Sequence, residues 1–153
     1  MASGWTNKGK VSILEAYFRN EGAPTNFYVA LVTSAVEPTA DHNSFSELTE
    51  ITAGNGYATG GFQLAKNSTD FDVLTEDDTN DRGYIQIKDI VWTASGGTIP
   101  DSGDGARWAI LLDDVVTIAG REILAYFDLS SDRTVSDGQT LTLSNSELRL
   151  DEP

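Results

Sequence analysis

Acidic side chains are concentrated in one short stretch of the sequence, and clusters of this kind can bind calcium. Residues 76–81 read EDDTND. Calcium takes about six to eight oxygen ligands, which several carboxylates on one flexible segment can supply. The spacing departs from that of an EF-hand loop, because Arg82 adjoins the stretch and a bidentate glutamate at the required distance is missing. Two interpretations therefore stand: a weak calcium site with Asp77, Asp78 and Asp81 as ligands, or a solvated acidic loop.

The residue types that perform covalent or acid–base chemistry in enzymes are scarce. The chain has no cysteine and a single histidine, His42, which lies among polar residues in an expected loop. The sequence contains neither a nucleophile elbow nor a glycine-rich phosphate loop between a strand and a helix. A carboxylate pair for glycoside hydrolysis stays open as an alternative, although no spacing singles out one pair. We therefore expect no catalytic residues and a protein that is not an enzyme.

Four aromatic residues could form a sugar-stacking surface, as in a lectin-like carbohydrate-binding module. Trp92 and Trp108 fall in expected strands and are predicted to be core residues. Trp5 precedes the expected helix and Tyr57 lies between glycine turns, so we predict that these two make exposed contacts.

The chain is strongly acidic, with 24 Asp and Glu residues against 10 Lys and Arg residues and a formal net charge of −14. An acidic surface repels phosphate backbones and anionic lipids, so we expect neither nucleic acid nor a membrane as a partner. The sequence also lacks a run of about 20 apolar residues, the length that spans a bilayer.

Residues 6–19 are predicted to form the one convincing helix. Val11, Leu14 and Phe18 recur at spacings of three and four residues, which is the period of a helix face. Capping and helix-breaking residues flank the segment: Thr6, Asn7, Gly22 and Pro24.

The same helix carries the small basic cluster Lys8, Lys10 and Arg19. We predict that residues 5–19 contact another protein, unless the helix only caps the fold. The residues predicted to interact with partners are Trp5, Lys8, Lys10, Tyr17, Phe18 and Tyr57.

After the helix, the hydrophobic pattern changes to period two, which is typical of strands. Turn residues separate the expected strands, which cover residues 26–33, 62–65, 84–92, 107–112, 122–129, 139–143 and 147–150. Residues 44–51 fit either a short helix or an extended segment, and residues 68–82 are predicted to be a polar connection. We predict a mainly β fold: one domain over residues 1–153, an antiparallel β-sandwich of jelly-roll or Greek-key type with one N-terminal α-helix.

The C-terminal strands are predicted in the most detail. Residues 133–150 are expected to form a β-hairpin or the last paired strands of the sandwich, with a turn at residues 137–138. The side chains predicted to point into the core are Leu141, Leu143, Leu148 and Leu150. Thr140 and Thr142 are predicted to point outward, because successive side chains leave opposite faces of a strand.

Four long strings resemble a family of small virion proteins of tailed bacteriophages. They are NFYVALVTSAVEPTAD, ELTEITAGNGYATGGFQLAKNSTDF, EDDTNDRGYIQIKDIVWTASGG and REILAYFDLSSDRTVSDGQTLTL. The resemblance extends from about Thr6 to Leu150 and rests on turns and strands. It implies a structural role in the virion and assigns no functional residues.

The resemblance leads us to expect a capsid decoration or cement protein on the outside of the phage head. Its partners would be the major capsid protein or other virion proteins, and it would form a homo-oligomer, for which a trimer suits an icosahedral lattice. The alternative is a tail or baseplate component. The contact predicted for residues 5–19 would be either the contact between subunits or the contact with the virion. We expect the protein to be made in the cytoplasm of the bacterial host, where a chain without cysteine suits the reducing conditions, and to end up in the virion.

Overall fold

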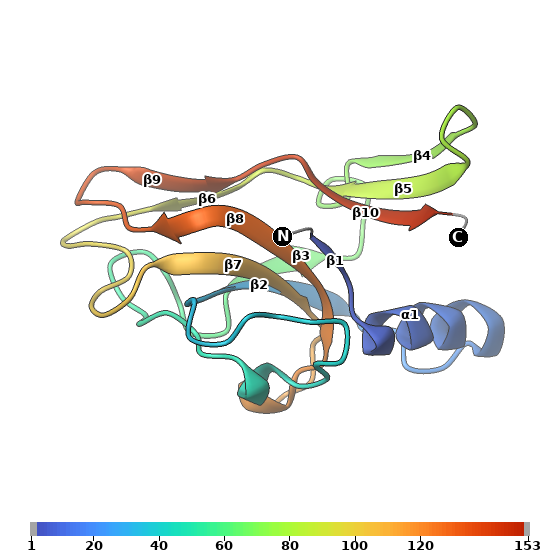
Figure 1. Ribbon diagram of the computed structural model, residues 1–153, viewed down its shortest axis with the longest axis horizontal. Coiled ribbons are helices and arrows are strands. Elements are labelled where there is room, and N and C mark those ends of the chain that lie inside the picture. Colours follow the sequence, from blue (N-terminus) through green and yellow to red (C-terminus); the bar gives the residue numbers. More distant parts are fainter. Residues whose placement is uncertain (1–2, 152–153) are drawn as a thin grey trace.

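The computed structural model describes residues 3–151, which form two layers of antiparallel strands and one N-terminal helix (Figure 1). Every strand pair within this part of the chain is antiparallel. The predicted fold class, a mainly β antiparallel sandwich with an N-terminal helix, is confirmed.

One layer is a five-stranded sheet in the order β1–β8–β7–β2–β3. Its strands are β1 (Gly4–Trp5), β2 (Asn26–Val32), β3 (Phe62–Ala65), β7 (Ala106–Leu112) and β8 (Ile123–Arg133). The central strands β2 and β7 pair from Tyr28 opposite Leu112 to Val32 opposite Trp108. Buried residues follow one another without alternation in β7, because both faces of this sheet are covered.

The second layer consists of a three-stranded sheet and a two-stranded sheet. The three-stranded sheet has the order β10–β5–β4, with β4 (Val73–Asp77), β5 (Arg82–Ile87) and β10 (Ser146–Asp151). The two-stranded sheet pairs β6 (Ile90–Thr93) with β9 (Thr140–Leu143). Since β5 leads into β6 and β9 leads into β10, residues 82–93 and 140–151 run side by side as one long antiparallel ribbon (Figure 1).

The main core lies between the two layers. Buried side chains of the five-stranded sheet, such as Leu31, Leu111 and Phe127, pack against buried side chains of the ribbon. The ribbon contributes Ile87, Ile90, Trp92, Leu141, Leu143 and Leu148. The predicted core positions of Trp92 and Trp108 and the inward positions of Leu141 and Leu143 are confirmed, as are the outward positions of Thr140 and Thr142.

The long connection from β2 to β3 covers the outer face of the five-stranded sheet. Phe45 and Leu48 from this connection pack with Trp108 and Tyr126. The segment that the sequence left ambiguous contains a 3₁₀ helix, η2 (Phe45–Glu47), which a capping box with Ser44 begins. A second 3₁₀ helix, η3 (Ile118–Gly120), precedes β8.

The N-terminal helix consists of α1 (Asn7–Leu14) and a π-helical continuation, η1 (Glu15–Arg19). These bounds agree with the predicted helix over residues 6–19, and Asn20 in the left-handed conformation ends it. The helix projects from the same end of the molecule as the sheet β10–β5–β4 (Figure 1). Within residues 3–151, no helix is long and apolar enough to cross a bilayer.

Two of the strand predictions are wrong. Residues 68–82 are not only a polar connection, because β4 forms there and pairs with β5 along its whole length. The single strand predicted over residues 84–92 is two strands that belong to different sheets, separated at Lys88 and Asp89.

Of the two arrangements predicted for residues 133–150, the β-hairpin is wrong, whereas the last paired strands of the sandwich are present. Strands β9 and β10 do not pair with each other: β9 pairs with β6 and β10 pairs with β5. Asn145, in the left-handed conformation, redirects the chain between them. Leu148 is buried as predicted, whereas Leu150 is exposed, because β10 extends beyond the core at that point.

Candidate interaction surface

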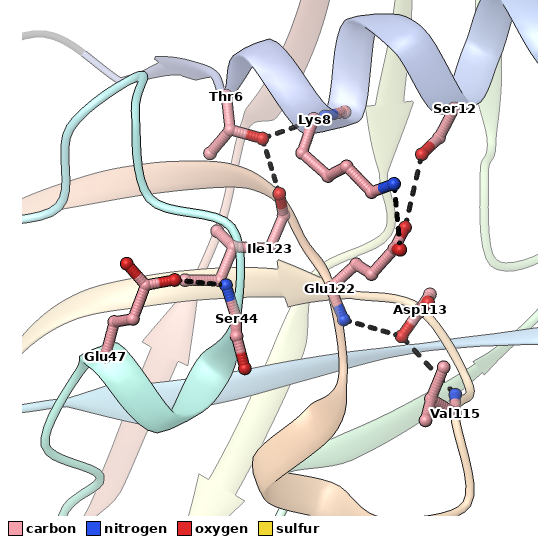
Figure 2. Close-up of polar contacts among 10 residues, drawn as sticks. Thr6, Lys8, Ser12, Ser44, Glu47, Asp113, Val115, Glu122 and Ile123 are labelled. Carbon is pink, nitrogen blue, oxygen red and sulfur yellow. Dashed lines mark hydrogen bonds and ion pairs between the residues drawn. The ribbon is translucent and has the colours of Figure 1, made fainter.

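The first turn of the N-terminal helix is fixed to strand β8 through Thr6 (Figure 2). Thr6 is fully buried and is the N-cap, with its Oγ accepting a hydrogen bond of 2.9 Å from the backbone N–H of Gly9. The same hydroxyl donates to the carbonyl oxygen of Ile123, and the backbone N–H of Thr6 donates to the carbonyl oxygen of Leu124 at 3.0 Å. One residue therefore both begins the helix and attaches it to the sheet.

We call the two layers of strands the body of the molecule. The side of the helix that faces the body carries small residues at spacings of three and four. These are Gly9, Ser12 and Ala16, of which Gly9 is buried and the other two are half-buried. Small side chains let the helix lie close to the end of β8, so the contact between helix and body is made largely by backbone and polar groups.

A polar cluster holds the next turn (Figure 2). Lys8 Nζ lies 3.0 Å from Glu122 Oε1, and Ser12 Oγ donates to Glu122 Oε2 at 3.4 Å. The hydrogen bond and charge of Glu122 raise the pKa of Lys8. Asp113 accepts the backbone N–H of Glu122 at 2.9 Å, and burial raises the pKa of this carboxyl group. Lys8, predicted to contact a partner, is thus engaged within its own chain.

Four large apolar side chains of the helix point away from the body, whereas Ile13 is half-buried. Val11 is 46% exposed, Leu14 56%, Phe18 75% and Tyr17 83%. The rings of Tyr17 and Phe18 contact each other edge to face, with centroids 5.1 Å apart. We call these four residues the helix patch. An amphipathic helix normally turns its apolar side to the core, and this one turns it outward.

Two basic residues flank the helix patch. Lys10 lies on the first turns and Arg19 at the end of η1, and both are exposed. Neither forms an ion pair with any residue between 3 and 151. An exposed apolar cluster with a polar rim is typical of a protein interaction site.

A second apolar surface is exposed on the sheet β10–β5–β4. Leu148, Ile85 and Leu74 lie directly opposite one another across its three strands and therefore share one face. Leu148 is buried and Ile85 is half-buried, but Leu74 is 78% exposed. Leu150, two residues beyond Leu148 on the same face, is 57% exposed. The sheet thus extends past the core, and we call its uncovered part, around Leu74 and Leu150, the overhang.

The acidic stretch of residues 76–81 lies at the tip of this sheet, partly in β4 and partly in the turn to β5. Asp77 accepts hydrogen bonds from Asn80 Nδ2 at 2.7 Å and from Arg82 Nε at 2.9 Å, which lower the pKa of its carboxyl group. Asp78 and Asp81 are exposed.

Among residues 3–151, no three acidic or histidine side chains converge as metal ligands. Asp77, one of the three candidate calcium ligands, is instead committed to Arg82 and Asn80.

The remaining candidates lie apart from one another. The prediction that Tyr57 makes exposed contacts is wrong: it is 3% exposed, and its hydroxyl donates to Glu50 Oε1 at 2.7 Å. Trp5 is half-buried, and its Nε1 donates to the carbonyl oxygen of Arg149 at 2.7 Å. His42 accepts the backbone N–H of Thr39 at 2.9 Å through Nδ1, which closes a local turn. Trp5 and Tyr57 therefore do not form a joint sugar-stacking surface.

The sequence contained a signal for the orientation of the helix that the apolar spacing alone did not reveal. The small residues Gly9, Ser12 and Ala16 repeat at helical spacing on the side opposite the apolar residues. A helix whose small side packs on the body must expose its large side. The sequence contained no such signal for the overhang. Leu148 and Leu150 follow the same alternating pattern, and only the structure shows that the core covers Leu148 and leaves Leu150 exposed.

Comparison of this chain with protein-family models, with curated proteins and with solved structures finds no match. The two exposed apolar surfaces are accordingly the features that a functional proposal has to explain.

Proposed function

We propose that this chain is a structural protein of a tailed-bacteriophage virion that acts by docking, as a decoration or cement protein on the outside of the capsid. The observation that carries the proposal is the helix patch: four large apolar side chains held outward by a helix whose first turns are fixed to the body. A rigidly presented apolar patch suits a protein whose task is to bind another protein.

Charge supports a place on the outer surface of the particle. The formal net charge of −14 disfavours contact with packaged DNA, because an acidic surface repels phosphates. The same charge does not disfavour contacts with other virion proteins. The resemblance of the chain to small phage virion proteins points the same way, and a tail or baseplate position is the alternative within this class.

Labelling of the particles tests the proposal. Virions assembled in cells that produce this chain are purified, its copy number is measured, and antibody labels are located by electron microscopy. We expect label on the heads at constant copy number. Label on the tail or baseplate would overturn the capsid position, and virions free of this protein would overturn the proposal as a whole.

A matched pair of variants tests the helix patch. Leu14→Ala with Phe18→Ala removes apolar area while keeping good helix formers, and we expect occupancy to fall about tenfold. Val116→Ala is the control, since Val116 is 97% exposed and lies outside the helix patch, on the loop between β7 and η3, and it should leave occupancy unchanged. Equal occupancy of both variants would contradict a role for the helix patch.

A further inference from the structure

We infer that the helix patch binds the overhang of a second copy of this chain. The inference goes beyond the proposed function, because it assigns the helix patch to a contact between two copies; the lower occupancy expected of the Leu14→Ala, Phe18→Ala variant would then follow from loss of the dimer. Each copy would present both halves of the contact: a helix with large apolar side chains and a sheet face with an uncovered apolar floor.

The shapes of the two surfaces match. Across the overhang, Leu150, Gly83 and Glu76 lie directly opposite one another on the same face as Leu74. Gly83 has no side chain, and nothing lies within 4 Å of the place that its Cβ would occupy. The floor is therefore hollow between Leu150 and β4. An aromatic side chain such as Phe18, which is 75% exposed, suits that hollow.

The charges of the two surfaces are complementary. The helix patch is flanked by Lys10 and Arg19, which have no ion-pair partner within residues 3–151. Around the overhang, Glu76, Asp78 and Asp151 are exposed. Opposite charges at the rim favour this pairing and set its register.

Pairing of two helix patches with each other is less favourable. Lys10 and Arg19 lie near opposite ends of the helix. In an antiparallel pair Lys10 of one copy would approach Arg19 of the other, and in a parallel pair each would approach its own equivalent. Like charges meet in both arrangements, which disfavours them.

The position of the two surfaces indicates how copies would assemble. The helix and the sheet β10–β5–β4 project from the same end of the molecule (Figure 1). Two copies that meet at this end can therefore place each helix on the overhang of the other around one two-fold axis. Such an interface is closed and uses both contacts at once.

Charge reversal tests the inference. The mass of the full-length chain, 16.5 kDa as a monomer, is measured by sedimentation equilibrium over a concentration series. We expect a dimer whose association weakens as salt is added. Reversing the helix charges (Lys10→Glu with Arg19→Glu) or the overhang charges (Glu76→Lys with Asp78→Lys) should weaken association about tenfold or more.

The combined variant with all four reversals decides the pairing, because it restores opposite charges between copies. We expect it to associate as tightly as the wild type, within about threefold. Gly83→Val, which fills the hollow without touching a charge, should weaken association while circular dichroism shows an intact fold. Failure of the combined variant to recover, or unchanged association of Gly83→Val, would overturn the helix–overhang contact.

The outcome is independent of the virion experiment. A wild-type chain that stays monomeric at every concentration but labels virions would overturn this inference and leave the proposed function standing. If the chain forms a dimer with the expected charge dependence but is missing from virions, the proposed function is overturned and this inference stands.

Discussion

Gly9 of the helix and Leu124 of strand β8 lie closer together than any side chain at position 9 would allow. A Cβ on residue 9 would stand 2.1 Å from the carbonyl oxygen of Leu124 and 2.8 Å from its carbonyl carbon. Since the obstacle is backbone, rotation of a side chain cannot relieve it. The absence of a side chain at Gly9 thus sets how closely the helix approaches the sheet.

Gly9→Ala should therefore destabilise the protein, although alanine is the better helix former by about 1 kcal/mol. The added Cβ must displace the helix from β8, and we expect a net loss of about 1–3 kcal/mol in the free energy of unfolding. Denaturant melts measure it. Gly120→Ala is the control, because its nearest neighbours would lie 3.8 Å from the new Cβ. Equal stability of the two variants would show that the helix can shift away from β8 without loss of stability.

The helix illustrates what the sequence could and could not predict. Spacing and capping residues gave its extent and its start at Thr6, because these depend on local backbone chemistry. Which side faces the body depends on the neighbouring strand. Periodicity identifies two sides of a helix, and the usual burial of the larger apolar side does not hold here, because Gly9 meets the backbone of Leu124.

The second layer shows a similar division. Alternation correctly placed Leu141 and Leu143 in the core, because every other residue of a strand shares a face. Strand partners were not predictable in the same way, since β9 pairs with β6 and β10 with β5, both distant in sequence. Strand β4 was not predicted because it contains acidic residues. It lies at the edge of its sheet, where charged residues are common.

Leu141→Ala should cost about 2–5 kcal/mol in the free energy of unfolding. Leu141 is 5% exposed and lies opposite Trp92 across the pair β6–β9, so truncation leaves a cavity between the layers. Thr142→Ala, one residue further along and facing solvent, should change the stability by only about 0.5 kcal/mol. Denaturant melts compare the two. Small, equal losses would mean that the register of β9 is wrong.

Asp128 should make part of the stability depend on acid pH. A hydrogen bond from the guanidinium group of Arg107 holds the pKa of Asp128 down at about 2, against an ordinary value of 3.8. A carboxyl group whose pKa is lower in the folded state stabilises the fold above its unfolded pKa. That contribution declines as the pH falls from about 4 to about 2.

Asp128→Asn removes this titration and tests it. The free energy of unfolding of the wild type should exceed that of the variant by the largest amount at neutral pH, and this excess should shrink between about pH 4 and pH 2. The variant keeps some acid sensitivity, because hydrogen bonds from Lys88 and from the backbone of Ala65 also lower the pKa of Asp70. A difference that stays constant down to pH 2 would contradict the lowered pKa of Asp128.

Thr6→Val should loosen the helix from the body while nearly preserving the volume of the side chain. Valine cannot accept the N–H of Gly9 or donate to the carbonyl of Ile123, and loss of such a cap costs about 1–2 kcal/mol. Thr6→Ser keeps the hydroxyl and should cost less. Limited digestion with trypsin provides a local measurement, since Lys10 and Arg19 are exposed cleavage sites on the helix. Cleavage there should accelerate in the valine variant and stay slow in the serine variant; equal rates in both would mean that the Thr6 hydroxyl does not hold the helix in place.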